Sequence, residues 1–273
     1  MWRSASEVNP TAWAVEHAID VIQSTYWDIV SVDLKKKDLI KFWRNPNVWS
    51  SWRFTLRYTG QDQANETYVA DNVNSISTIS SSNAADTQIV RIEGHTMTGW
   101  NRTFVVQTAT LNGQNKVTLT TPLNRCTRVS HNDQTSVSIV WEVYVYQDTA
   151  LTAWKPTDTT KIHLTMPAWV NQSQKASTSL SSTDYWIITW FSAWYLEKSG
   201  TNVADIQLEV REPWGVFKPR SNPMIIQTGI ESDRRFNPYL VVPKNSDIRI
   251  TAQSSATGQE ITGDVEWYLA IIV

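Results

Sequence analysis

The chain has 273 residues, with 24 Lys and Arg against 26 Asp and Glu, so its formal net charge is −2. This balance lacks the excess of positive charge that binds nucleic acid, and we expect no sequence-specific nucleic-acid partner. An apolar fraction of 41% suffices for a buried core, which excludes a disordered chain. The single cysteine, Cys126, excludes an internal disulfide and a thiolate zinc site.

The sequence contains no recognisable signal for membrane insertion or export. No apolar run reaches the roughly 18 residues of a bilayer span, and residues 1–4 do not open the apolar stretch of a signal peptide. We therefore expect no transmembrane segment and no export by the signal-peptide route.

Residues 1–49 have the pattern of an N-terminal helical arm. Asn9 is a suitable helix cap, and Pro10 suits the first helical position. One apolar stripe follows at helical spacing, formed by Val15, Ala18, Ile19 and Ile22. These features predict a helix over residues 10–24. The later basic run 35–37 is either a solvated face or part of an arm that packs on a neighbouring subunit.

From residue 52 onward the hydrophobic period changes to two. Ile206, Leu208 and Val210 alternate with polar residues, which predicts a half-buried strand, and the longer run 137–146 places Trp141 on an apolar strand face. Similar runs occur at 54–58, 89–92, 104–110, 116–120, 185–195, 247–251 and 260–272. Turn signals such as 111–115 and 256–258 separate many of them. The fold class that we expect is mainly β, with two antiparallel β-sandwich or jelly-roll units and the helical arm.

The polar stretch 149–160 is the best linker candidate. It divides the chain into an arm (1–49), a first β-unit (50–148), the linker (149–160) and a second β-unit (161–273). The serine-rich tracts 75–83 and 173–183 are expected to be exposed loops, since both precede strong strand signals.

Residues able to carry chemistry are scattered. The histidines have no metal-binding spacing; they are His17, His95, His131 and His163. Cys126, between Arg125 and Thr127, is more readily explained as a buried apolar residue than as a nucleophile. No nucleophile-elbow, phosphate-loop, dinucleotide or EF-hand motif occurs in the sequence.

The sequence does not exclude a pair of carboxylates that cleaves glycosides, because four glutamates lie on or beside expected strands: Glu142, Glu209, Glu212 and Glu266. Any chain with this many acids offers such pairs, so they carry little weight. We expect no enzyme, no catalytic, cofactor-binding or metal-binding residue, and no cofactor.

Tryptophan is the compositional oddity, with 15 residues. Trp186, Trp190 and Trp194 are four residues apart, which places them on one face of a strand. Such a row either packs in the core or a subunit interface, or it stacks on sugar rings. Core or interface is the better explanation.

Several strand-and-turn phrases resemble virion structural proteins of environmental, largely marine, bacteriophages. They are ISTISSSNAADTQ (76–88), VRIEG (90–94), TLNGQ (110–114), VTLTT (117–121), VPKNSDIRI (242–250) and YLA (268–270). The resemblance spans most of residues 72–273. It implies a structural subunit of the particle, whether in the shell or as a decoration, spike or fibre protein.

The sequence thus predicts a non-enzymatic capsid or capsid-associated subunit of a bacteriophage virion, assembled in the host cytoplasm. Its expected partners are copies of itself and other virion proteins, joined through apolar, tryptophan-rich interfaces. The alternative is a receptor-binding β-sandwich that recognises carbohydrate on the host surface, and a polysaccharide depolymerase comes third.

Overall fold

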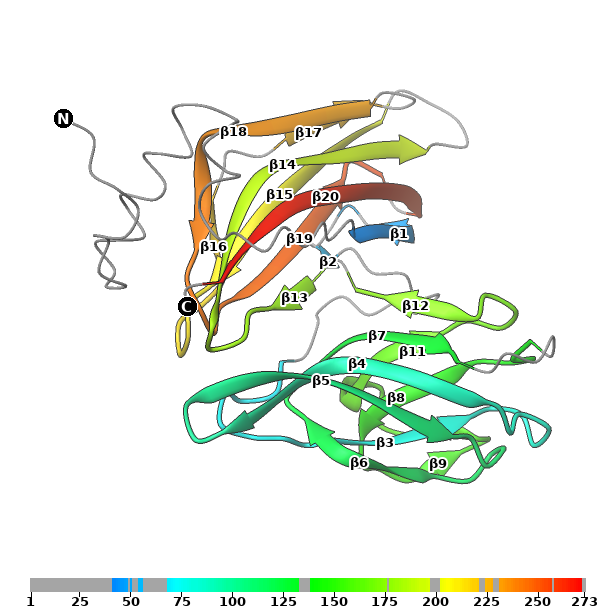
Figure 1. Ribbon diagram of the computed structural model, residues 1–273. Helices are drawn as coiled ribbons and strands as arrows, with labels where there is room; N and C mark the ends of the chain where they lie inside the picture. The colour runs from blue at the N-terminus through cyan, green and yellow to red at the C-terminus, as the bar shows by residue number, and fades with distance from the viewer. Residues whose placement is uncertain are drawn as a thin grey trace.

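The computed structural model describes residues 41–48, 50, 54–55, 68–132, 138–175, 177–196, 202–220, 224–227, 231–256 and 258–271. Across these residues the chain is mainly β, arranged in several antiparallel sheets (Figure 1). Their helical content is limited to the short 3₁₀ helix η3 (Thr159–Lys161), and they contain no helix with the length and hydrophobicity of a membrane span. The helix expected at 10–24 lies outside the described residues.

Two four-stranded sheets, which we call the first sheet pair, pack against each other. One has the order β12-β7-β4-β5 and the other the order β11-β8-β3-β6. Their strands are β3 (Ile76–Ser81), β4 (Ile89–Thr98), β5 (Asn101–Thr110), β6 (Val117–Leu123), β7 (Arg125–His131), β8 (Val143–Gln147), β11 (Ile162–Met166) and β12 (Gln172–Gln174). The small hairpin β9 (Leu151–Thr152) and β10 (Lys155–Pro156) lies beside them.

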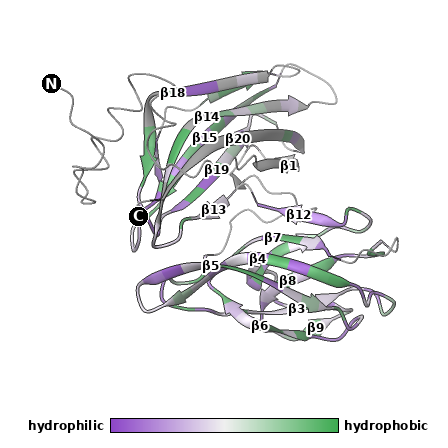
Figure 2. Cartoon of the chain, in the orientation of Figure 1, coloured by the Kyte–Doolittle hydropathy of each residue, from purple (hydrophilic) through white to green (hydrophobic). Residues whose placement is uncertain are grey.

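Hydrophobic side chains from both sheets fill the space between them. Ile92 on β4 and Val129 on β7 are fully buried, as are Ile79 on β3 and Val145 on β8. Along β4 buried and exposed residues alternate over much of the strand, as a two-residue period requires when one face is buried. Figure 2 shows hydrophobic and hydrophilic segments succeeding each other along these strands.

The other strands form the second sheet pair. One sheet has the order β1-β20-β14-β18, and the other contains β13, β19, β15 and β16, with β17 on β15 and β2 on β19. The strands are β1 (Lys41–Val48), β2 (Phe54–Thr55), β13 (Ser177–Ser179), β14 (Asp184–Leu196), β15 (Val203–Arg211), β16 (Lys218–Pro219), β17 (Met224–Gln227), β18 (Glu231–Val242), β19 (Asp247–Ser254) and β20 (Gln259–Ile271). Ile206, Leu208 and Val210 lie in its core, as their alternation predicts.

The connectivity of the chain bears on where its units begin and end. Residues 41–48, at the end of the expected arm, form β1, which pairs with β20. The expected linker 149–160 contains β9, β10 and most of η3, and the chain then returns to the first sheet pair as β11, which pairs with β8. It passes to the second sheet pair only between Gln174 on β12 and Ser177 on β13.

Both serine-rich tracts were wrongly expected to be exposed loops. The first contains β3, where Ser80 and Ser81 are buried, and the second contains β12 and β13, where Ser179 is buried. Two of these buried hydroxyls have a partner: Ser81 donates to Asp86, and Ser179 donates to Asp247.

The strand expected at 137–146 is also shorter than its pattern indicates, since β8 begins only at Val143. Asp86 accepts hydrogen bonds from the backbone N–H groups of Val140 and Trp141, and these bonds hold the chain in a bend. Trp141 is therefore exposed and does not lie on an apolar strand face.

Candidate functional site

The two sheet pairs meet at five charged side chains, which we call the junction cluster: Asp71, Arg102, Arg125, Arg211 and Asp247. The first three belong to the first sheet pair, where Asp71 precedes β3, Arg102 lies on β5 and Arg125 opens β7. Arg211 ends β15 and Asp247 opens β19 of the second sheet pair. The side chains of Arg102 and Asp247 are only 1% and 2% exposed. Ionised groups are this deeply buried only when they are paired, so the cluster fixes one sheet pair against the other.

Asp247 lies at the centre of the cluster. The Nε and Nη2 atoms of Arg125 donate to its two carboxylate oxygens at 3.2 and 3.1 Å, in the forked geometry that suits a guanidinium. Arg102 Nη1 lies 3.0 Å from Asp247 Oδ1, and Arg211 Nε lies 3.0 Å from Asp247 Oδ2. Asp71 accepts from Arg125 at 2.7 Å and from Arg211 at 2.8 Å. The carboxylates thus bridge guanidinium groups from both sheet pairs.

A tight turn places Asp247. Ser246 N donates to Pro243 O at 3.3 Å, and Asn245 has a φ of 60°, a left-handed conformation that Asn tolerates. The carbonyls of Asn245 and Ser246 accept from Arg102 Nη1 at 2.9 and 3.2 Å. This turn thus forms part of the contact between the sheet pairs.

Burial and charge act against each other in this cluster. Burial alone would raise the pKa of Asp247, but Arg125, Arg102 and Arg211 outweigh it and hold that pKa well below the usual range. Burial lowers the pKa of Arg102, against the opposing attraction of Asp247. For Arg125, burial also favours the neutral form, yet Asp247 and Asp71 raise its pKa. The Asp247 carboxylate therefore stays ionised to low pH.

Three guanidinium groups face two carboxylates, so the cluster has one excess positive charge. Aromatic rings contribute to balancing it, because a ring face attracts a cation. The guanidinium carbons of Arg125 and Arg211 lie 5.2 and 5.1 Å from the centre of the Tyr68 ring, and Arg211 is also 5.5 Å from that of Phe217.

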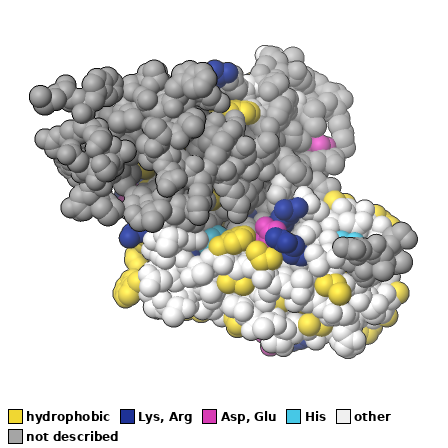
Figure 3. All heavy atoms as spheres, in the orientation of Figure 1, with side chains coloured by type: hydrophobic (Ala, Val, Ile, Leu, Met, Phe, Trp, Pro, Cys, Tyr) yellow, Lys and Arg dark blue, Asp and Glu magenta, His cyan; other side chains and the backbone are white. Residues whose placement is uncertain are grey.

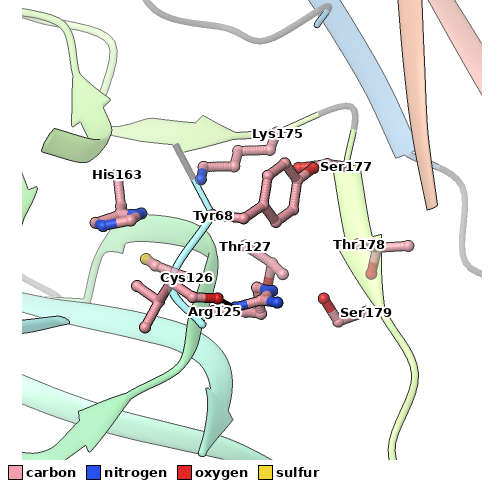
Figure 4. Close-up of a pocket in the computed structure, with 10 residues that line it drawn as sticks. Tyr68, Arg125, Cys126, Thr127, His163, Lys175, Ser177, Thr178 and Ser179 are labelled. Atoms are coloured by element: carbon pink, nitrogen blue, oxygen red, sulfur yellow. Dashed lines mark hydrogen bonds between the residues drawn. The ribbon is translucent and has the colours of Figure 1, made fainter. Parts of the chain in front are cut away.

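A small cavity lies beside Arg125 (Figure 4). Tyr68, Cys126, His163 and Lys175 contribute to its lining, and the cavity volume is about 10 Å³. That is room for about one water molecule. Cys126 and His163 share this cavity, which is too small to admit a substrate.

The histidines, which have no metal-binding spacing in the sequence, do not gather at one site among the described residues. His17 lies outside those residues. His95 is buried and packs edge-on against Phe104, with ring centroids 5.3 Å apart. His163 Nε2 lies 2.8 Å from Gln147 Nε2, while His131 ends β7. Within the described part of the chain, no group of three or more His, Cys, Asp or Glu side chains has the arrangement of a metal site.

Three of the four glutamates considered for catalysis are held by basic side chains. Glu142 bonds Lys155 at 2.8 Å, Glu209 bonds Arg249 at 2.6 Å, and Glu212 pairs with Arg220. Burial alone would raise the pKa of Glu142, but hydrogen bonds from Lys155 and Tyr144 lower it. A general acid needs the opposite shift. The fourth, Glu266, lies on β20.

The tryptophans whose side chains the structure describes divide into two groups. Trp186 is buried in the second core and cannot stack on a sugar, while Trp190 is half-buried and the side chain of Trp194 lies outside the described residues. The exposed group lies on turns and loops: Trp100, Trp141, Trp154, Trp169 and Trp214. The period-two pattern of strands does not mark such turn positions.

Trp100 and Trp214 are paired across the junction. Trp100 follows β4 and Trp214 follows β15, and their rings meet edge to face with centroids 5.0 Å apart. Trp214 N also donates to Asp71 Oδ2 at 3.0 Å. These two exposed indoles thus extend the contact between the sheet pairs to the molecular surface.

The described fold is that of an all-β protein with two sheet pairs joined by buried ion pairs. No protein-family model matches the chain, and no curated protein matches it. Among solved structures, the chain is similar to the structure of infectious bursal disease virus strain Gx. The identity is 10% over 88% of this chain and 73% of that chain, and the TM-score is 0.25. The T13 particle of the same virus gives 10% identity over 94% and 76% of the two chains, with a TM-score of 0.27.

The VP2 subviral particle of infectious bursal disease virus is similar at 11% identity, over 88% of this chain and 73% of that one, with a TM-score of 0.25. TM-scores this low do not establish a common fold, so we assign neither fold family nor function from them.

Proposed function

We propose that this chain is a non-enzymatic structural protein of a bacteriophage virion, a capsid or capsid-associated subunit that is assembled in the host cytoplasm. It forms homo-oligomers and contacts other virion proteins through exposed, tryptophan-rich surfaces. The phrases of the sequence that resemble phage virion proteins support the phage assignment.

We further propose that its two sheet pairs are β-sandwich or jelly-roll units. Residues 68–175 form one unit, and residues 177–271 form the other together with β1 and β2. Each has its own hydrophobic core, which supports this division over the boundary at 149–160.

One observation carries the assembly role: Trp141 and Trp169 are exposed on loops that are bonded to each other. Trp169 N donates to Ile139 O at 3.2 Å, and Ile139 N donates to Asn171 Oδ1 at 3.1 Å. Trp141 is 54% exposed and Trp169 is 66% exposed. Because tryptophan is enriched at protein interfaces, two exposed indoles on tied loops indicate a contact surface.

Other features support the same role. Hydrophobic side chains are distributed over the visible face of the first sheet pair, with basic and acidic side chains grouped among them (Figure 3). The junction cluster fixes the two sheet pairs against each other, so contacts made by one unit are held in a set direction relative to the other. A subunit of a symmetric particle needs this rigidity.

Light scattering at micromolar concentration tests the assembly role. The wild type is expected to be oligomeric, and the double variant Trp141→Ser, Trp169→Ser is expected to shift towards the monomer. Ile225→Ser is a control, because Ile225 is 72% exposed on β17 of the other sheet pair. A wild type that is monomeric throughout the concentration range, or a double variant with an unchanged mass, would contradict the proposed function.

The polysaccharide depolymerase hypothesis has less support than the structural role, because Glu142, Glu209 and Glu212 each bond a basic side chain. It would gain support only if the protein cleaved a bacterial polysaccharide and a Glu→Gln change at one of these positions lowered turnover by orders of magnitude. The carbohydrate-binding reading rests on a different surface, which is described next.

A further inference from the structure

An open groove with a volume of about 560 Å³ lies on the first sheet pair, away from the junction cluster. Gln114, Asn115 and Lys116, in the connection from β5 to β6, form one wall, and Leu151 and Trp154 of the β9–β10 hairpin contribute to the other. We call it the Trp154 groove. It combines one exposed indole with several polar side chains and is open to solvent.

Trp154 occupies a backbone position that its own side chain disfavours. The hairpin joins Thr152 to Lys155 through a two-residue turn, in which Ala153 and Trp154 have φ values of 46° and 68°. Such turns favour Gly and Asn, because a larger side chain crowds its own backbone in the left-handed region. The indole is 53% exposed, so burial does not fully compensate for this strain. Strain that the fold does not need is typical of functional positions.

The opposite wall is fixed before any ligand arrives. Gly113 N donates to Asp86 O at 2.8 Å, and Ser81 N donates to Gly113 O at 3.1 Å, which ties the 111–116 connection to the segment after β3. Lys116 Nζ bonds Asp148 Oδ1 at 2.7 Å, and Asp148 directly follows β8. A wall held in this way loses little conformational entropy when it binds.

The polar side chains retain capacity for hydrogen bonds. Gln114 donates to Ser82 O at 3.1 Å and Asn115 donates to Asn112 O at 3.1 Å, but within the described residues neither side-chain oxygen accepts a bond. The ion pair of Lys116 and Asp148 is exposed and offers both donors and an acceptor. Lys116 is the one charged side chain among the described residues that line the groove, and it is already paired with Asp148, so the lining favours a neutral ligand.

We propose that the Trp154 groove binds a neutral hexopyranose unit of an oligosaccharide. The apolar face of the sugar ring lies on the indole of Trp154, and its hydroxyls bond the side chains of Gln114 and Asn115 and the Lys116–Asp148 pair. A sugar ring has an apolar face and several hydroxyl groups, and these match a site with one aromatic plane and neutral amides. This site goes beyond the assembly role and does not depend on it.

Saturation-transfer NMR of the full chain with neutral gluco-, galacto- and manno-configured oligosaccharides tests the proposal. A shallow site with one aromatic plane is expected to bind with a dissociation constant on the order of 1 mM. Trp154→Ala should weaken binding at least about tenfold, and Trp154→Asn should do the same while the residue accepts the positive φ. Trp214→Ala is the matched control, because Trp214 is also exposed at a positive φ, 62°, but does not line the groove.

The proposal would be overturned by no saturation transfer to any sugar of the panel, by equal binding of the wild type and Trp154→Ala, or by an equal loss in Trp214→Ala. A lower oligomer mass in Trp154→Ala would also overturn it, since Trp154 would then be a contact between copies. The assembly role fails separately, through the Trp141 and Trp169 variants, so the two failures are distinguishable.

Discussion

At the scale of single residues, charge balance governs the junction cluster. Asp247→Asn leaves three guanidinium groups facing one carboxylate, so we expect a loss of roughly 3–5 kcal/mol in unfolding free energy. Arg102→Met leaves two of each sign and keeps much of the side-chain volume, so it should cost less than half as much. Urea unfolding measures both. Equal losses would mean that packing, and not charge, controls the cluster.

Gly113 has two reasons to be glycine. Its φ is 56°, and a Cβ atom there would lie 2.5 Å from the backbone oxygen of Ala84. Gly113→Ala should therefore lower the unfolding free energy by well over about 1 kcal/mol. Gly99→Ala separates the two causes, because Gly99 has a φ of 59° but a Cβ atom there meets nothing within 4 Å. If the two variants cost the same in thermal unfolding, the close approach to Ala84 has no energetic effect.

At the scale of elements, the β9–β10 hairpin should be stabilised by a sequence that suits its turn. Replacing Ala153 by Asn and Trp154 by Gly supplies the residues that two-residue hairpins favour, and we expect a gain of about 1 kcal/mol. Chemical denaturation measures the gain. A large loss of unfolding free energy would show that Trp154 stabilises the fold through packing and that its positive φ causes little strain.

The pattern of elements explains how much the sequence could predict. Strict alternation identified β15, because Ile206, Leu208 and Val210 meet one core and the residues between them do not. The serine-rich β3 could not be found in this way, since serine is more often exposed than buried, whereas Ser80 and Ser81 are buried and Asp86 in the following loop accepts from Ser81. Trp141 was misplaced because that same carboxylate bends the chain beside it.

The candidate site was beyond sequence reasoning for a similar reason. Arg102 and Asp247 are 145 positions apart, and no spacing rule connects them. The turn carbonyls of Asn245 and Ser246 and the Arg102 side chain that donates to them belong to different sheet pairs, so no local pattern joins them. Trp154 looked ordinary in the sequence because its distinguishing property is a backbone angle.

At the scale of the molecule, acid should lower the free energy of unfolding through its effect on the junction cluster. The folded-state pKa of Asp247 is lowered, so below its unfolded value of about 4 the unfolded chain takes up a proton that the folded chain refuses. The stability that Asp247 contributes is thus present above about pH 4 and is lost as the pH falls towards the folded-state pKa. Urea unfolding between about pH 3 and pH 7 should show this decline, and Asp247→Asn should flatten it. An unchanged slope in the variant would contradict the assignment.

The order of strands along the chain has a consequence for how the molecule can change. β1 and β2 come before the first sheet pair and β13 to β20 come after it, yet all of them belong to the second sheet pair. The first sheet pair is thus inserted between strands of the second, and Tyr68, which precedes β3, and Lys175, which follows β12, line the same small cavity. Domain insertion is tolerated where the two ends of the insert lie close together. A different module could replace this one only if it also supplied partners for the charges of Arg211 and Asp247.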